Sequence, residues 1–256
     1  MVDFIDPNVK MRTNPTTMHG NTHLPKEDVE ELQQRLDYNL AYNYEKPKDY
    51  DRIIFVHLPK GAGNFLNYFF IWNKLPVDII AHNKESNIVK RTEKNEKDFF
   101  FTVVRNPFDY WVSNFFYGKR YGNRGGFWGA DLKRRLDNSD HKKEFNDFVD
   151  WVCERKIESD SLTSYYNEFL YDVKGKFAPN EVCRFENLRQ DISRVFSKLG
   201  YKNIYENMEW FESRKGKVNS VKHKHYSEYY TPDSIEKVRQ KEKTIIDKYG
   251  YEFNDK

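Results

Sequence analysis

The chain has 256 residues, of which 38% are apolar and 17% aromatic, enough for one sizeable α/β domain. Its 43 basic and 40 acidic side chains leave a net charge of +3, too little for nucleic-acid binding by bulk charge, so no nucleic-acid partner is expected. No apolar run reaches the roughly 18 residues of a membrane span, and no signal pattern opens the chain. We therefore expect no membrane association and a cytoplasmic protein. Cys153 and Cys183 lack metal-ligand spacing and are expected to be reduced core thiols.

Residues 1–49 are expected to form an N-terminal arm and one amphipathic helix outside the main domain at 50–256. The first 25 residues are polar and interrupted by prolines, which favours an extended arm. Apolar residues then recur at helical spacing: Val29, Leu32, Leu36 and Leu40. This segment is a candidate contact for a homodimer, although the sequence does not set the oligomeric state.

Short apolar runs bounded by turns predict strands at 52–58, 77–81 and 99–104. Helices are expected after the first and third strands, over about 64–75 and 107–117. Strands that alternate with helices are typical of a parallel sheet with crossover helices. The predicted fold is therefore α/β, a single domain with a central, mostly parallel sheet flanked by helices.

The second half of the chain is expected to be mainly helical. Residues 118–144 combine glycines, aromatic residues and a local basic excess, which indicates a lid or an excursion on the substrate side. Further elements are expected in order: helices at 145–156 and 162–173, a short strand, a turn and a helix ended by Gly200, and a last helix with Thr231 as N-cap, Pro232 at its first position and Gly250 at its end.

The turn between the first strand and helix, Pro59-Lys60-Gly61-Ala62-Gly63-Asn64, suits an anion. A glycine turn that opens a helix directs backbone N–H groups at one point, and Lys60 adds a full positive charge. Nucleotide triphosphatases place their glycines before the lysine and a Ser or Thr after it, whereas Gly61 follows here. We expect a phosphate or sulfate site without a metal. A plain tight turn with a surface lysine is the alternative.

The next strand ends in a second set of candidate anion ligands. Arg105 stands at the strand end, and Ser113 lies eight residues later in the following helix. Both turns should open at the carboxyl edge of the sheet, where ligands bind, so the pair suits a nucleotide phosphorylated at two positions. The alternative for Arg105 is a salt bridge to a nearby acid such as Asp109.

The segments FVHLPKGAGN (55–64) and FTVVRNPFDYWVSNFFYG (101–118) together resemble the sulfotransferases that use 3′-phosphoadenosine 5′-phosphosulfate (PAPS). The likeness is greatest to the branch whose loop reads roughly F-V-H-x-P-K-T-A-G-T-S and which largely acts on carbohydrates. It covers roughly residues 50–256, with weaker echoes in VCRFENL and YYTPDSIEKV…YGYEF. The resemblance implies a P-loop-like sulfotransferase fold, PAPS as sulfuryl donor, adenosine 3′,5′-bisphosphate (PAP) as product, and an acceptor hydroxyl on a glycan or small molecule.

The resemblance also implies roles for individual residues. The loop from Lys60 to Asn64 would wrap the 5′-phosphosulfate, with Lys60 on the bridging oxygen of the leaving group. Arg105 and Ser113 would hold the 3′-phosphate. A short element that touches the same phosphate in the cytosolic branch is matched by three residues, for which a solvated basic turn is the alternative: Arg214, Lys215 and Gly216.

Two positions of the loop depart from the family pattern, which usually has Thr or Ser where Gly61 and Asn64 stand. The glycine removes one hydroxyl donor, while Asn64 can still cap the helix and donate an amide hydrogen. The departures leave open a non-catalytic relative that binds nucleotide or sulfated ligands. A nucleotide-dependent phosphotransferase is the third possibility, against which the order of the loop argues.

Sulfuryl transfer needs a base that takes the proton of the acceptor hydroxyl. His82, at the end of the strand 77–81, is our candidate, with Glu85 as the second choice and Lys84 as a ligand of the sulfuryl oxygens. A polar turn residue without a catalytic part is the alternative for His82. His57, just before the loop, is expected to be structural.

The acceptor is weakly encoded in the sequence. Three aromatic residues of the 118–144 excursion are candidates for stacking on sugar rings: Tyr121, Phe127 and Trp128. The segment KHKHYSEYY (222–230) is a second candidate wall.

Overall fold

The computed structural model describes residues 47–81, 94–121, 140–154, 161–215 and 223–254. The N-terminal arm and helix expected before residue 47 lie outside these ranges.

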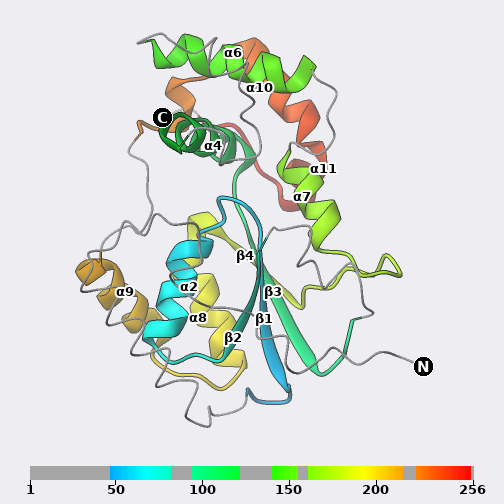
Figure 1. The fold of residues 1–256 in the computed structure, drawn as a ribbon, viewed down its shortest axis with the longest axis vertical. Coiled ribbons are helices and arrows are strands. Elements are labelled where there is room, and N and C mark those ends of the chain that lie inside the picture. Colours follow the sequence, from blue (N-terminus) through cyan, green and yellow to red (C-terminus); the bar gives the residue numbers. More distant parts are fainter. Residues whose placement is uncertain (1–46, 82–93, 122–139, 155–160, 216–222, 255–256) are drawn as a thin grey trace.

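The centre of the fold is a sheet of four parallel strands in the order β2-β1-β3-β4 (Figure 1). The strands are β1 (Arg52–His57), β2 (Val77–Ala81), β3 (Asp98–Val104) and β4 (Glu181–Arg184). The parallel sheet and the first three strand positions are as predicted. Every residue of β3 is buried, which is typical of a strand covered on both faces.

The two faces of the sheet carry separate hydrophobic cores, because successive side chains of a strand point to opposite sides. Ile53 and Phe55 of β1 pack with three helices: α2 (Gly63–Trp72), α8 (Leu188–Lys198) and α9 (Ile204–Lys215). Ile54 and Val56 pack on the other side with the remaining helices: α4 (Pro107–Tyr121), α6 (His141–Glu154), α7 (Leu162–Phe169), α10 (Pro232–Lys241) and α11 (Lys243–Tyr249). Figure 1 shows this second group as a helical layer above the carboxyl ends of the strands.

Both ends of the excursion expected at 118–144 are helical instead. Helix α4 continues through Gly118 to Tyr121, and α6 already begins at His141. Phe115 and Phe116 are buried near the end of α4, and Lys119 forms an ion pair with the buried Glu144 of α6. Tertiary packing therefore overrides the helix-breaking tendency of one glycine.

The C-terminal helix expected as one element is divided at Glu242 into α10 and α11. The Glu242 carboxylate is fully buried and accepts hydrogen bonds from Trp111 Nε1 at 2.7 Å and from the amides of Leu162 and Thr163 at 2.8 and 2.7 Å. It thus supplies the acceptor that the first turn of α7 lacks, and burial raises the pKa of its carboxyl. The predicted ends are confirmed: Thr231 is the N-cap, and Gly250 adopts φ 62°.

Helix α9 is an element that our reading of the sequence missed. Its buried residues Ile204, Met208 and Phe211 recur at the i, i+4, i+7 spacing of a helix face, a signal that was available. The backbone of Arg214 and Lys215 is the last part of this helix and not a basic turn.

Both cysteines are free thiols, with Cys183 completely buried in β4 and Cys153 partly buried in α6. Within the described ranges, no helix has the length and apolar character needed to cross a membrane.

Candidate functional site

The backbone of the loop after β1 has the form of an anion-binding concavity. Lys60 and Ala62 both adopt left-handed backbone conformations with φ 60°, while the intervening Gly61 does not. Such alternation can turn N–H groups of a loop toward a common point, although here the amide of Gly61 already donates to the Leu58 carbonyl oxygen at 3.2 Å. The first intrahelical bond of α2 runs from Leu66 N to Ala62 O, so the amides of the preceding first turn have no acceptor within the helix.

The two glycines of the loop serve close packing rather than unusual dihedral angles. A Cβ atom at Gly61 would lie 2.8 Å from the carbonyl oxygen of Val103 at the end of β3. A Cβ atom at Gly63 would lie 1.9 Å from Nε2 of His57, whose ring covers that position. The missing side chain at 61 therefore lets the loop rest directly on the neighbouring strand, and His57 has a structural position, as expected.

The Lys60 side chain is partly buried, and its Nζ lies over the ring of Tyr117, 3.9 Å from the centroid. Burial, and to a lesser degree the nearby positive charge of Arg105, lowers the pKa of Lys60 to about 7. Within the described part of the chain, no carboxylate forms an ion pair with it. The site therefore holds a cation that would gain from an added anion.

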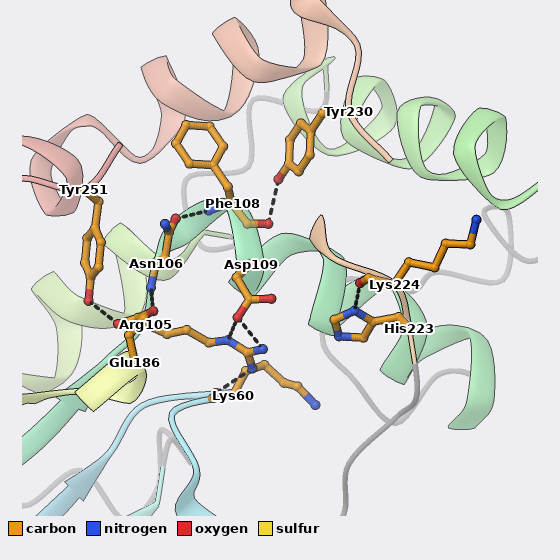
Figure 2. A network of polar contacts seen from close by, with 10 residues as sticks. All are labelled: Lys60, Arg105, Asn106, Phe108, Asp109, Glu186, His223, Lys224, Tyr230 and Tyr251. Atoms are coloured by element: carbon orange, nitrogen blue, oxygen red, sulfur yellow. Dashed lines mark hydrogen bonds and ion pairs between the residues drawn. The ribbon is translucent and has the colours of Figure 1, made fainter. Parts of the chain in front are cut away.

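Arg105 lies in direct contact with the loop (Figure 2). Its Nη1 donates to the carbonyl oxygen of Lys60 at 3.2 Å, and its guanidinium lies 4.1 Å from the ring centre of Phe185. Its Nε and Nη2 approach Oδ2 of Asp109 at 2.8 and 2.7 Å, so the ion pair considered as an alternative is formed. The two turns are thus brought together, and Asp109 neutralises part of the charge of Arg105.

The turn that carries Arg105 is held by Glu186, which follows β4, and Glu186 in turn is held by Tyr251 near the C-terminus. The Asn106 amide donates to Glu186 at 2.6 Å, and the Tyr251 hydroxyl donates to the same carboxylate at 3.2 Å. Asn106 Oδ1 also accepts from the amide of Phe108 at 3.0 Å, which caps α4. The sequence motifs assign no role to these residues, although Glu186 and Tyr251 lie in the segments VCRFENL and YGYEF.

Ser113 lies on the face of α4 that Lys60 follows. Asp109, Ser113 and Tyr117 are spaced by four residues and so form one column along the helix. At the Asp109 end of this column, the Lys60 carbonyl oxygen accepts a hydrogen bond from Arg105. At the other end, the Lys60 ammonium lies over the Tyr117 ring. The structure therefore brings Lys60 and Arg105 into contact, and helical spacing puts Ser113 on the same face of α4.

His223 and Lys224 also lie beside this part of α4. The His223 ring stacks on Phe116 of α4 with centroids 5.5 Å apart, and its Nδ1 lies 2.7 Å from the Lys224 carbonyl oxygen. Figure 2 shows His223 and Lys224 on the side of the network toward which the Lys60 amino group extends.

Several predicted site residues lie outside the described residues or are described by backbone alone. Those outside the described residues are His82, Lys84, Glu85, Phe127, Trp128 and Gly216. Ala81, just before His82, pairs with His57 at the end of β1, so the described chain stops at the same edge of the sheet. Tyr121, Arg214 and Lys215 are described by backbone alone. The Phe211 ring lies 5.5 Å from that of Phe65 in the first turn of α2, so α9 ends on the side of the loop.

Comparison of the chain with protein-family models, with curated proteins and with solved structures finds no match. Across the ranges the structure describes, no three His, Cys, Asp or Glu side chains are grouped so that they could hold a metal ion.

Proposed function

We propose that this chain has a P-loop-like sulfotransferase fold and transfers the sulfuryl group of PAPS to an acceptor hydroxyl, on a carbohydrate in the first instance. The observation that carries the proposal is the contact between Lys60 and Arg105 at the carboxyl edge of the sheet. Two cationic side chains from neighbouring strand ends suit a ligand with two phosphates, and the concave loop backbone suits the phosphate nearer to Lys60.

In the proposed reaction, the acceptor oxygen attacks sulfur in line with the leaving group. The new O–S bond forms as the bond from sulfur to the 5′-phosphate oxygen breaks, and PAP leaves with the bonding electrons. Lys60, as ammonium, stabilises the charge that develops on that oxygen, together with the amides of Ala62, Gly63 and Asn64; the Gly61 amide already donates to the Leu58 carbonyl oxygen. The proton of the hydroxyl passes to His82, with Glu85 as the second candidate.

Arg105 and Ser113 are proposed to hold the 3′-phosphate. Asp109 and the Lys60 carbonyl engage three of the five N–H bonds of Arg105, which leaves two for a phosphate. Arg214, Lys215 and Gly216 are assigned to the same phosphate by resemblance. Lys84 is assigned to the sulfuryl oxygens, and the proposed sugar contacts are Tyr121, Phe127 and Trp128.

A non-catalytic relative that binds the same nucleotide is the second candidate function. The close approach of Gly61 to Val103 favours it, because a donor hydroxyl has no room at that position. The same observation counts against a phosphotransferase, which would need a Ser or Thr there to bind magnesium.

Binding and transfer can be tested separately. Calorimetry with PAP in the absence of magnesium should show binding that Lys60→Ala and Arg105→Ala each weaken by about tenfold or more. Unchanged affinity in both variants would contradict the site. The transfer of labelled sulfate from PAPS to a panel of glycans and alcohols then distinguishes an enzyme from a binding protein.

His82→Ala should lower turnover by about a hundredfold or more and leave PAP affinity intact. Full turnover in this variant would remove His82 from the mechanism, and Glu85→Gln then tests the second candidate. For the Arg105→Ala binding experiment, Arg239→Ala on the exposed face of α10 is the control, because it removes an arginine far from the proposed site.

A further inference from the structure

One buried polar group beside this site lacks a hydrogen-bond partner. Asn114 of α4 is only 5% exposed, and its Nδ2 has no partner among the described residues. An amide N–H removed from water without an acceptor costs free energy, and such groups are uncommon in folded proteins. Packing alone does not explain an asparagine here, because an apolar side chain of similar size would avoid that cost.

The helical spacing of α4 puts Asn114 one turn before Tyr117, whose ring the Lys60 ammonium contacts. Tyr117 follows Asn114 by three residues, which is neighbour spacing on a helix. Helical side chains lean toward the N-terminus, so the Tyr117 ring extends over the turn that contains Asn114. The Lys60 Nζ lies 3.9 Å from the centre of this ring.

The Lys60 ammonium and the Asn114 amide can both donate to the same acceptor. Lys60 is a cation that forms no ion pair with a described carboxylate, and Asn114 offers N–H bonds that no described acceptor uses. A single oxyanion between them would accept from both. The loop backbone opens toward an anion from the Lys60 side, and Ser113 adds a hydroxyl adjacent to Asn114 in the sequence.

We propose that Asn114 donates a hydrogen bond to an oxygen of the same tetrahedral anion that Lys60 holds. The inference rests on the proposed function only for the identity of that anion, which there is the transferring sulfuryl group or the 5′-phosphate attached to it. A neutral amide next to the lysine orients the anion, whereas a second cation would mainly add charge.

Inorganic phosphate is the first probe, titrated by calorimetry against the full chain at pH 7. Asn114→Leu removes the donor at similar size. Asn114→Asp replaces the donor with a carboxylate, which has the same sign of charge as phosphate. Both should weaken phosphate binding by about tenfold or more, with the larger loss for the aspartate. Asn167→Leu makes the same exchange at an exposed position of α7 and should bind phosphate as the wild type does.

Thermal unfolding without ligand separates a binding role from a structural one. If Asn114 serves a ligand, Asn114→Leu should leave the melting temperature of the free protein unchanged or raise it, because an unused buried donor is removed. A lower melting temperature together with unchanged phosphate affinity would overturn the proposal. Asn114→Ala, which also removes the donor and adds no bulk, provides the same comparison if the leucine variant does not fold.

Two further ligands separate this inference from the proposed function. Weaker binding of both PAP and PAPS by Asn114→Leu assigns the contact to the 5′-phosphate, and weaker binding of PAPS alone assigns it to the sulfuryl group. If the wild type binds phosphate through Asn114 but neither nucleotide, the anion site stands and the proposed function is wrong. If the wild type does not bind phosphate, PAP or PAPS, the anion site itself is wrong.

Discussion

Arg105 Nη1 donates a hydrogen bond to the carbonyl oxygen of Lys60 at 3.2 Å, although 45 positions separate the two residues in the chain. The contact joins the loop after β1 to the turn after β3, two strands that are neighbours in the sheet. It uses the backbone of Lys60 and leaves the ammonium directed toward Tyr117. Lys60 thus connects the two proposed phosphate contacts through its backbone, and the charge of its side chain stays available to a ligand.

The low pKa of Lys60, about 7, predicts that PAP binding depends on pH. An added phosphate favours the ammonium and raises this pKa, so above pH 7 binding must take up a proton. The dissociation constant should therefore rise by up to about tenfold per pH unit from pH 7 toward pH 9. Calorimetry in buffers of different ionisation enthalpy measures both the affinity and the proton uptake.

Lys60→Met is the control for this pH dependence. This variant should bind PAP more weakly than the wild type, but its dissociation constant should not begin to rise at pH 7. The free protein provides a second check. Between pH 7 and about 10.5 the unfolded chain binds more protons at Lys60 than the folded chain, so this residue makes stability increase with pH in that window. A wild-type affinity that is constant from pH 7 to pH 9 would contradict the low pKa.

Gly61→Ser would introduce the hydroxyl that the sulfotransferase pattern has, yet we expect it to harm the protein. The new Cβ would lie 2.8 Å from the Val103 carbonyl oxygen and 3.3 Å from that of Leu58, both backbone atoms that no rotamer change can move. Overpacking of this kind costs about 1–3 kcal/mol of unfolding free energy. Denaturant unfolding should show that loss, and PAP affinity should fall. Asn64→Ser, the other departure, lies at a partly exposed position and is the matched control; improved binding by Gly61→Ser would refute this view of the loop.

Gly63→Ala should destabilise the protein through the His57 ring, because the added methyl group would overlap Nε2. We expect a loss of about 1–3 kcal/mol by thermal unfolding. His57→Ala removes the obstacle, so the double variant should lose less stability than the sum of the two single variants. Additive losses would show that His57 does not restrict position 63.

Much of the sheet and of the site was predictable from local patterns. Apolar runs located β1, β2 and β3, and the turns after β1 and β3 identified Lys60 and Arg105, because a parallel sheet brings such strand ends to one edge. The division at Glu242 was not predictable, since a glutamate in a charged helical stretch looks solvent-exposed until Trp111 and α7 are placed around it.

The sequence by itself determined that charged and glycine-rich turns leave neighbouring strands, and on this pattern rests the proposal of an anion site. Only the tertiary structure decided what the individual side chains do there. It placed Asp109 on Arg105 and the Lys60 ammonium on Tyr117, and it left Asn114 buried without a partner among the described residues. Local spacing sets which residues share a helix face, but burial and the choice of partner depend on segments far apart in the chain.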